Sequence, residues 1–578
     1  METNLFQSIC DIVDEHCETK ETVARWIYPE KENKVLPEIL LKSYDLSAAL
    51  RAAGIEKGDR VAVILENSIS YASLLIAIWS LGAIAVPMKT KTSPFSNIET
   101  FVFSCNEVCS FKCLIVEENN VLLTTNIQHF NETLTTVLTV DDLEQFEFST
   151  FLSNQENCRV SLSGKDIAII QFSSGSTGKP KGVIVTHEMM MNQLENLSKK
   201  SGLFIDGDKS LASWLPFHHD MGLFIGVLLP LFLGCNNYIC SPQYYIRNPL
   251  QWFKLLSDKK VNGTMTTSSA LSIFLNSFDG MFIDHDKIAH PFDGSLDFGE
   301  LHIVLGAEKV NAKVVKRSID ILSVYGLKEC QIHTGYGMAE ATLGITCSVD
   351  TPLHGHFFKF IDETTLEPAD ENDLNTLELV PLGDPYDMHE LFIFDQNEHE
   401  VDDLIVGEIY IRGPSISPGY YNNLEETSFV FKNGGFMTGD LGFKHDGEIY
   451  FLSRKDDVAV IGGRNVVPDD IELAIESLGV CRTGNTCFFA YENEKGQSEA
   501  IVLVGINART PKSHMENIRS KIVKHVYREQ QVVLSRVVFC SKNEIEKTSS
   551  GKKRRKVIKT RFSNNQIKDL SKYVISTT

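Results

Sequence analysis

One twelve-residue stretch, QFSSGSTGKPKG from Gln171 to Gly182, constrains this chain more than any other segment. It contains three glycines, four serine or threonine residues and two lysines, and apolar runs that predict strands lie directly before and after it. Glycine lets a backbone approach a ligand closely, and successive N–H groups can then surround an anion. The stretch therefore predicts a polyphosphate-binding loop between two strands, with the binding residues Ser173, Ser174, Gly175, Ser176, Thr177, Gly178 and Lys181.

This loop differs from the Walker pattern, because no GxxxxGK[ST] is present and a predicted strand, not a helix, follows it. A solvated Gly/Ser linker is the alternative interpretation. Such a linker is not expected between two β-branched runs, so the sequence favours the polyphosphate loop.

The length of 578 residues predicts at least two domains, because a single core rarely grows to that size. The net charge of −21 argues against nucleic acid as a general partner. The acidic N-terminus does not resemble a signal peptide, and the longest apolar runs are shorter than the roughly 18 to 20 residues that a membrane span needs. We therefore expect a cytoplasmic protein without stable membrane insertion.

The thirteen cysteines include no CxxC pair, which favours free thiols in a reducing compartment. Cys105, Cys109 and Cys113 are spaced to fall on one helical face, so a metal site is an alternative there. No histidine is near them in the sequence, and buried free cysteine is more common than a metal ligand. We therefore expect buried thiols.

A polar triplet, His218, His219 and Asp220, interrupts the apolar run from Ser213 to Leu231. Buried polar groups are costly unless they are paired, so the triplet predicts the wall of a pocket. A metal site is again the alternative. Adjacent histidines on a strand point to opposite faces, which disfavours a shared ion.

Helical and strand patterns alternate between residues 42 and 86, which predicts a mostly parallel sheet. Farther along, the small residues Gly306 and Ala307 end another predicted strand, where a flat base could approach the backbone. Tyr336 could stack on such a base, and Gly337 would leave room for it. These patterns suit a nucleotide site.

The stretch SSGSTGKPKG resembles the phosphate-loop signature of the adenylate-forming superfamily, and the resemblance continues in register from about Leu41 to Arg555. It implies an α/β fold with a large N-terminal domain (1–455) of mixed and parallel sheets flanked by helices, and a small mobile α+β C-terminal domain (456–578). Asp456 falls at the implied hinge. Lys552 in KTSSGK matches the adenylation lysine, and a nuclear-localisation or nucleic-acid patch is the alternative interpretation of this basic run.

The resemblance also implies that ATP and Mg²⁺ are cofactors. The nucleotide contacts that it implies, beyond the loop, are Gly306, Ala307, Glu308, Tyr336, Gly337, Met338, Asp440 and Arg454. Asp440 and Arg454 match the residues that bind the ribose and phosphates. Glu340, which is also expected to be catalytic, and Thr177 would hold the metal ion.

The string WLPxxHDMGL, with GVLLPL behind it, is closer to fatty acyl-AMP ligases than to the superfamily at large. In these ligases the segment lines the acyl pocket, which implies a catalytic role for His219 and substrate contacts for Asp220, Met221 and Gly222. The acidic, loop-like stretch 348–381 resembles the extra segment of such ligases, and a surface insertion is the alternative.

The chain departs from the pattern of the superfamily in two places. Ser268, Ser269 and Ala270 stand where Pro-Asn-Phe is usual, and Ser453 stands where glycine is usual. The first departure leaves the shape of the acyl tunnel open.

These observations predict an ATP-dependent fatty acyl-AMP ligase, which makes fatty acyl-AMP and pyrophosphate from a fatty acid. The acyl group would then pass to the phosphopantetheine of a separate, stand-alone acyl carrier protein, in polyketide, lipopeptide or lipid biosynthesis. The alternatives are a long- or medium-chain acyl-CoA synthetase and a catalytically silent regulator that binds acyl-adenylate.

Overall fold

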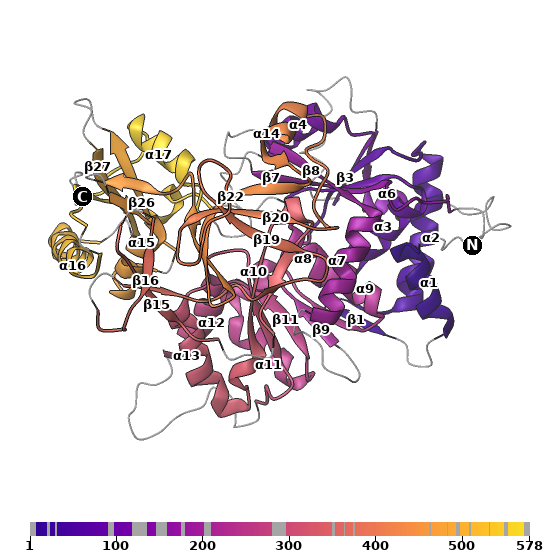
Figure 1. The fold of residues 1–578 in the computed structure, drawn as a ribbon. Helices are drawn as coiled ribbons and strands as arrows, with labels where there is room; N and C mark the ends of the chain where they lie inside the picture. Colours follow the sequence, from indigo (N-terminus) through magenta and orange to yellow (C-terminus); the bar gives the residue numbers. More distant parts are fainter. Residues whose placement is uncertain are drawn as a thin grey trace, which may run out of the picture.

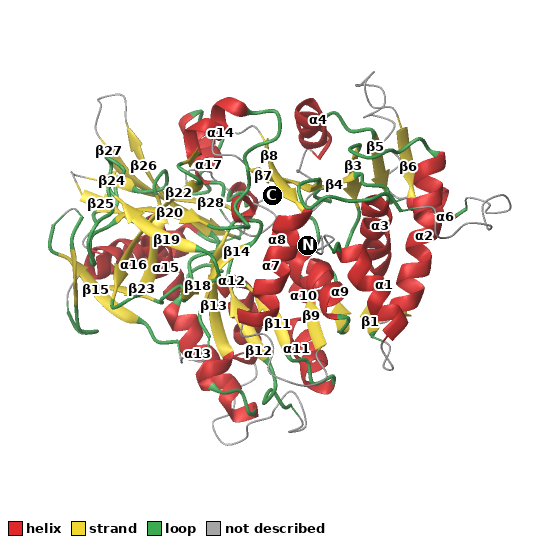
Figure 2. Ribbon diagram, turned by 45° about the vertical axis from the view of Figure 1, so that its right-hand side comes forward, coloured by secondary structure: helices red, strands yellow, loops and turns green. Residues whose placement is uncertain are grey.

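The fold consists of two large sheets with helices between and around them, followed by smaller sheets that lead to the C-terminus (Figures 1 and 2). This computed structural model describes residues 7–19, 24–28, 32–90, 98–117, 136–145, 159–174, 180–200, 210–279, 296–349, 353–362, 364–373, 376–461, 464–482, 484–492, 498–507, 510–530, 532–547 and 553–571. We call the described residues up to 455 the N-terminal part and those from 456 the C-terminal part.

The first large sheet has six strands, all parallel to their neighbours except the last pair. In spatial order they are β6 (Thr136–Thr139), β5 (Cys113–Val116), β3 (Arg60–Ile64), β4 (Ile84–Pro87), β7 (Ile167–Ser174) and β8 (Pro180–Thr186). β7 and β8 are an antiparallel pair, so the predicted phosphate loop connects neighbouring strands. This confirms the two predicted strands.

The second large sheet has nine strands and a parallel centre. In spatial order they are β18 (Asp384–Pro385), β14 (Gly344–Cys347), β13 (Ile332–Gly337), β12 (His302–Leu305), β11 (Gly263–Thr266), β9 (Ser210–Ser213), β10 (Asn236–Ile239), β1 (Arg25–Tyr28) and β2 (Glu32–Val35). Antiparallel strands complete the sheet at both edges. The mixed and parallel sheets expected from the sequence are therefore confirmed.

Helices of the N-terminal part pack between and around these sheets (Figure 2). They are α1 (Ile9–Thr19), α2 (Leu36–Ala52), α3 (Ile69–Ser80), α4 (Ile98–Cys109), α6 (Val140–Glu144), α7 (His187–Lys200), α8 (Asp220–Leu223), the π-helix η3 (Phe224–Leu228), α9 (Leu229–Leu233), α10 (Pro242–Arg247), α11 (Pro249–Asp258), α12 (Ser268–Asp279), α13 (Ala312–Leu322), and the 3₁₀ turns η4 (Ser323–Tyr325), η5 (Glu329–Gln331) and η6 (Ala339–Ala341). α3 contacts β4 of one sheet and β1 of the other. Because it lies between two sheets, α3 is apolar and buried on nearly every side.

A third sheet follows, built from β19 (Glu390–Phe394), β20 (Gly407–Arg412), β22 (Gly435–His445) and β21 (Phe431–Lys432), with β23 (Glu448–Arg454) paired to β22 and α14 (Leu424–Val430) beside it. The turn at Asp446 and Gly447 makes β22 and β23 a hairpin.

The stretch 348–381 contains a three-stranded sheet, although its sequence is loop-like. The strands are β15 (His356–Phe360), β16 (Leu366–Pro368) and β17 (Leu377–Leu379). Phe358 of this sheet packs against Phe443 and Tyr450 of the β22–β23 hairpin, and Val467 of the C-terminal part joins the same apolar cluster. The stretch is therefore packed against the body of the protein and is not a solvated loop.

The C-terminal part has apolar clusters of its own, whose buried residues all lie at or beyond Ala459. Its elements are β24 (Ala459–Ile461), β25 (Arg464–Val466), α15 (Pro468–Ser477), β26 (Thr486–Glu492), β27 (Ser498–Ile506), α16 (Lys512–Gln530), β28 (Arg536–Ser541), the 3₁₀ turn η7 (Lys542–Glu544) and α17 (Arg555–Ser563). This is the smaller α+β unit expected from the sequence.

Within the residues described above, no helix combines the length and the apolar character needed to cross a bilayer.

Candidate active site

Five predicted site residues lie outside the described residues: Gly175, Ser176, Thr177, Gly178 and Lys552. Their roles remain predictions. Ser173 and Ser174 are the last two residues of β7, and in the ladder they stand opposite Lys181 and Pro180 of β8. The two strands therefore hold the ends of the predicted phosphate loop together.

Lys181, at the start of β8, has a carboxylate partner that the sequence did not reveal. Its ammonium group forms an ion pair with Glu426 of α14 and lies 5.1 Å from the centre of the Tyr420 ring. The only sequence signal for this partner is the pair of acidic residues in the first turn of α14. In this structure Lys181 is thus engaged by a side chain from a distant segment.

Glu340 lies on η6 and is connected to the same group of residues. The Tyr420 hydroxyl donates a hydrogen bond of 3.0 Å to Glu340 Oε1. Burial, together with the charge of Glu340, raises the pKa of Tyr420, so this phenol stays protonated and remains a donor. Tyr420 therefore orients the carboxylate that was predicted to hold a metal ion.

Asp440 is nearly sealed from solvent, with 2% exposure, and lies at the centre of a second group. The Tyr336 hydroxyl from β13 donates to Asp440 Oδ2 at 2.8 Å, and Arg454 Nε lies 2.8 Å from Asp440 Oδ1. Burial and the nearby carboxylate both raise the pKa of Tyr336 well above its usual range. Asp440 and Arg454 face each other across the β22–β23 hairpin, so the fold joins three separately predicted residues.

The ends of β12 and β13 pack backbone against backbone. A Cβ on Gly306 would lie 3.1 Å from the carbonyl oxygen of Gly335, and a Cβ on Gly337 would lie 1.9 Å from that of Leu343. Ala307 adopts a left-handed conformation with a φ of 66°. Met338 follows Gly337, the last residue of β13, and directly precedes η6. The small residues predicted at these positions are therefore required by close packing.

The carboxylate of Glu308, after β12, contacts the first turn of α12. Glu308 Oε2 accepts a hydrogen bond of 3.0 Å from the Ser269 hydroxyl, and the backbone N–H of Ser269 also donates to this carboxylate. Ser269 belongs to the departure from the family pattern noted in the sequence. This departure therefore supplies a partner for Glu308.

His218 and His219 lie in a turn and Asp220 is the first residue of α8, so the two histidines do not lie on a strand. His219 Nδ1 lies 2.6 Å from Asp220 Oδ1, and burial lowers the pKa of His218 to about 3, helped by its neighbour His219. Met221 and Gly222 continue into α8, where a Cβ on Gly222 would lie 2.1 Å from the carbonyl oxygen of Pro216. This turn is tightly packed, and its role as the wall of a pocket remains a prediction.

The expected helical face of three cysteines is wrong in one respect. Cys105 and Cys109 lie on α4, but Cys113 lies on β5, because the helix ends at Cys109. All three thiols are buried, and burial raises their pKa values. In the described ranges, no group of three or more His, Cys, Asp or Glu residues is arranged to hold a metal ion.

Asp456, predicted as the hinge, lies two residues beyond the end of β23. Its carboxylate lies 2.6 Å from Lys556 Nζ of α17, and both side chains are more than half exposed. Its role as a hinge remains a prediction.

Comparison with protein families gives two matches. The profile of the AMP-binding enzyme family matches residues 37–421, which is about two thirds of the chain. The profile described as the AMP domain of Disco-interacting protein 2-like proteins matches residues 456–572. The hairpin of β22 and β23, which carries Asp440 and Arg454, lies between the two matched ranges.

Among curated proteins, the chain is 29% identical over 425 residues to the medium-chain-fatty-acid–[acyl-carrier-protein] ligase JamA of Moorena producens, covering 69% of this chain and 68% of that protein. It is 27% identical over 420 residues to the long-chain-fatty-acid–AMP ligase FadD26 of Mycobacterium marinum, covering 68% and 69%. A solved structure from studies of fatty acyl-adenylate ligases of E. coli and L. pneumophila superposes with a TM-score of 0.85 at 22% identity, covering 97% of this chain and 98% of that one. This last likeness concerns the fold.

Proposed function

The chain belongs to the AMP-binding enzyme family, and from this premise we propose that it is a fatty acyl-AMP ligase. It activates a fatty acid with ATP, forming fatty acyl-AMP and pyrophosphate. The acyl group then passes to the phosphopantetheine thiol of a separate acyl carrier protein. The names of JamA and FadD26 support both the fatty acid and the type of acceptor.

The observation that carries this proposal is the group around Asp440. Tyr336, Asp440 and Arg454 come from separate motifs and meet through contacts of 2.8 Å. A buried carboxylate held by a neutral donor and a guanidinium is preorganised to accept two hydroxyl groups of a ribose. We assign nucleoside binding to Asp440 and Arg454, and adenine contacts to Gly306, Ala307, Glu308, Tyr336, Gly337 and Met338.

The side chains also suit a magnesium ion. Mg²⁺ prefers oxygen ligands, and the Glu340 carboxylate is already oriented by Tyr420. We propose that Glu340 and Thr177 hold the ion, which when bound offsets the negative charge of the phosphates. Lys181 would exchange Glu426 for a phosphate oxygen, because the single positive charge of its ammonium group cannot neutralise both anions.

A fatty carboxylate is a poor electrophile at neutral pH and must first become a mixed anhydride. In the proposed reaction, one carboxylate oxygen bonds to the α-phosphorus of ATP while the bond to the bridging oxygen breaks and pyrophosphate leaves. Two anions approach each other in this step, so preorganised positive groups lower the barrier more than covalent catalysis would. We assign that role to Lys552, with Lys181 on the leaving pyrophosphate.

The acyl chain would lie against the wall formed by His219, Asp220, Met221 and Gly222. The three-stranded sheet in 348–381 supports the ligase over the acyl-CoA synthetase. This sheet packs on the hairpin that carries Asp440 and Arg454, as an integral part of the fold.

One assay tests the proposal. Purified protein is incubated with ATP, Mg²⁺ and laurate, and pyrophosphate release and lauroyl-AMP are measured. Coenzyme A or a phosphopantetheinylated carrier protein is then added, and lauroyl thioester is quantified. We expect lauroyl-AMP and transfer to the carrier protein. Efficient formation of lauroyl-CoA would instead identify an acyl-CoA synthetase.

The adenylation lysine provides a matched pair of variants. Lys552→Ala should lower pyrophosphate release by about 10² to 10³-fold, the usual size of a single electrostatic contribution. Lys559→Ala, at an exposed position on α17, should have no effect. Equal rates in the two variants would favour a silent regulator over an enzyme.

A further inference from the structure

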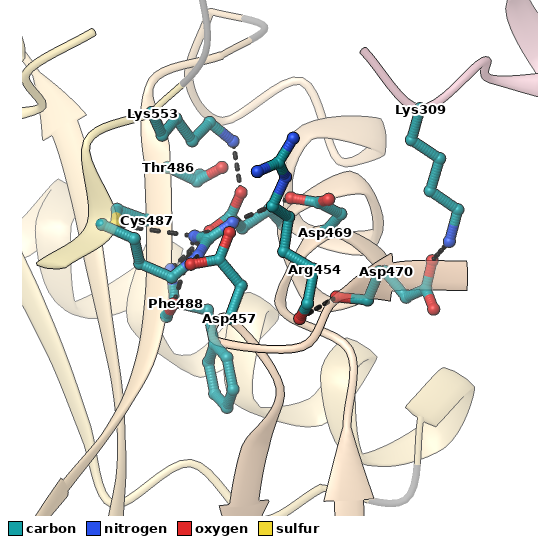
Figure 3. Close-up of polar contacts among 12 residues, drawn as sticks. Lys309, Arg454, Asp457, Asp469, Asp470, Thr486, Cys487, Phe488 and Lys553 are labelled. Carbon is teal, nitrogen blue, oxygen red and sulfur yellow. Dashed lines mark hydrogen bonds and ion pairs between the residues drawn. The ribbon is translucent and has the colours of Figure 1, made fainter. Parts of the chain in front are cut away.

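A buried ion pair joins the N-terminal and C-terminal parts (Figure 3). Lys309, one residue beyond Glu308, places its Nζ 2.7 Å from Asp470 Oδ1 on α15. The two side chains are only 10% and 15% exposed. Exposed ion pairs contribute little, but a pair shielded from water in this way is strongly coupled, and removing one partner leaves the other charge buried.

Asp470 depends on this partner. Its second oxygen, Oδ2, is buried and has no hydrogen-bond partner among the residues that the structure describes. Asp470 lies in the first turn of α15, where a negative charge is also favoured by the helix dipole. Lys309 thus adds a charged contact between the N-terminal part and this helix end, next to the apolar contact made by Val467.

The same helix anchors the segment that follows Lys552. Asp469 pairs with Arg555 at 2.8 Å, and Glu472, one turn later, pairs with both Arg555 and Lys553. Glu472 is 1% exposed and also accepts a hydrogen bond from the backbone N–H of Phe488. Figure 3 shows this cluster from Lys309 through Asp469 and Asp470 to Lys553.

Burial alone would raise the pKa of Asp469, but Arg555, Lys553 and Lys309 together hold it below its usual value. Asp469 is therefore ionised together with its partners. α15 thus presents carboxylates to both sides, to Lys309 of the N-terminal part and to the basic residues around Lys552. An antiparallel backbone bridge joins Lys547 and Lys553, the two residues that flank positions 548–552.

The residues on both sides of this segment, Lys547 and Arg554, also interact with charged residues of the N-terminal part. Burial and the charge of Lys553 lower the pKa of Lys547, and Glu308 is among the charges that oppose this shift. On the other side, burial and then Arg554 lower the pKa of Lys89, which follows β4. Lys547 and Arg554, on either side of this segment, therefore interact electrostatically with Glu308 and Lys89 of the N-terminal part.

We propose that Lys309 and Asp470 are positioning residues for adenylate formation: their ion pair docks α15 on the N-terminal part and so sets where the segment carrying Lys552 meets the nucleotide. This inference rests on the proposed function. Neither residue touches the reacting atoms. Each acts through α15 and its buried cluster, so the pair contributes to the first half-reaction, in which this orientation is used.

The test compares the two half-reactions in Lys309→Ala, Asp470→Ala and the double variant. Each single variant should lower the rate of lauroyl-AMP formation by about tenfold to 100-fold, the size of effect expected when a distant change misplaces a catalytic group by about 1 Å. Transfer from preformed lauroyl-AMP to the carrier protein should change less than twofold. The double variant should be no slower than the single ones, because both remove one interaction.

Two further variants separate positioning from general destabilisation. Asp470→Glu keeps the charge and should restore most of the rate, whereas Lys316→Ala, exposed on α13, should match the unchanged protein. Equal losses in both half-reactions, additive effects in the double variant, or no rescue by Asp470→Glu would overturn the proposal.

A readout without catalysis distinguishes this proposal from the proposed function. Hydrogen–deuterium exchange in the unliganded protein should rise in Asp470→Ala at peptides covering 306–312 and 467–473. Unchanged exchange there would overturn the docking role even if the enzyme makes lauroyl-AMP. Increased exchange in a protein that makes none would support the docking role and reject the function.

Discussion

Asp440 receives a neutral donor on one oxygen and a cation on the other, and the two contacts can be removed separately. Tyr336→Phe deletes only the hydroxyl and leaves Arg454 in place. We expect a rise of less than tenfold in the KM for ATP and a melting temperature lower by a few degrees, because a buried acceptor loses its donor at a cost of about 1 to 3 kcal/mol.

Asp440→Asn should be more damaging than Tyr336→Phe. The change keeps the shape but removes the charge that faces Arg454, so we expect the rate of adenylate formation at low ATP to fall by about 10²-fold. Rates measured over a series of ATP concentrations check both variants. The assignment of Asp440 to the nucleoside would be wrong if the tyrosine variant lost as much activity as the asparagine variant.

His187 predicts a pH dependence of stability. The residue is 1% exposed, its ring meets Trp79 edge-on, and burial lowers its pKa from 6.5 to about 4, with Asp166 opposing and Lys57 assisting the shift. Between these values the unfolded chain binds more protons than the folded one. The contribution of His187 is therefore complete above pH 6.5 and is lost as the pH falls toward 4, by about 2 kcal/mol between pH 6.5 and roughly pH 5.

Melting temperatures of the unchanged protein and His187→Phe across this pH range test this contribution. The variant should show a shallower fall toward acid, whatever its absolute stability. His399→Gln is the matched control, since His399 has an 80% exposed side chain. Identical slopes for His187→Phe and the unchanged protein would show that this imidazole does not titrate on unfolding.

Single residues also show where the sequence was informative. Asp440 and Arg454 were predicted because each stands in a motif that the family shares. Glu426, Ser269 and Asp470 were not predicted as partners, because each contact joins segments that are far apart in the chain and no local pattern marks it. Pairing of this kind depends on tertiary packing.

At the scale of elements, the meeting of β13 with the turn after η6 yields a steric prediction. Gly337→Ala would place a methyl group 1.9 Å from the carbonyl oxygen of Leu343, whereas at Gly335 the nearest atom is Val304 Cγ1 at 3.4 Å. Backbone must therefore move in the first variant. Overpacking of this kind costs about 1 to 3 kcal/mol or more.

We expect Gly337→Ala to lower both the melting temperature and the rate of adenylate formation, and Gly335→Ala, on the same strand, to change neither appreciably. Thermal unfolding followed by circular dichroism and pyrophosphate release provide the measurements. A tolerated Gly337→Ala would mean that this strand end adapts more readily than its packing suggests.

Elements differ in how well the sequence predicts them. The β7–β8 pair follows from the apolar runs on either side of a glycine-rich stretch, and it is confirmed. The strands in 348–381 were missed because they are only three to five residues long and lie among acidic residues. Their apolar side chains pack against distant residues that include Phe443 and Tyr450.

At the scale of the whole molecule, the predicted boundary between residues 455 and 456 can be tested by truncation. The buried clusters of the C-terminal part begin at Ala459, and Val467 is the residue from beyond the boundary that joins a cluster of the N-terminal part. A chain ending at Lys455 should therefore unfold cooperatively but form no lauroyl-AMP, because it lacks Lys552.

Thermal unfolding of this shortened chain, compared with that of the complete one, provides the measurement. A chain of residues 456–578 should unfold cooperatively as well. Failure of the shortened N-terminal chain to fold would place the boundary elsewhere, whereas residual adenylate formation would remove Lys552 from the chemistry.

The strand order of the nine-stranded sheet has a consequence for synthesis on the ribosome. β1 and β2 are made first, yet the parallel neighbour of β1 is β10, which emerges about 200 residues later. At about 5 to 20 residues per second, the early hairpin waits roughly 10 to 40 seconds for its neighbour. During that interval Trp26, fully buried in the finished protein, has no sheet to enter, so the nascent chain is a natural client for a chaperone at this stage.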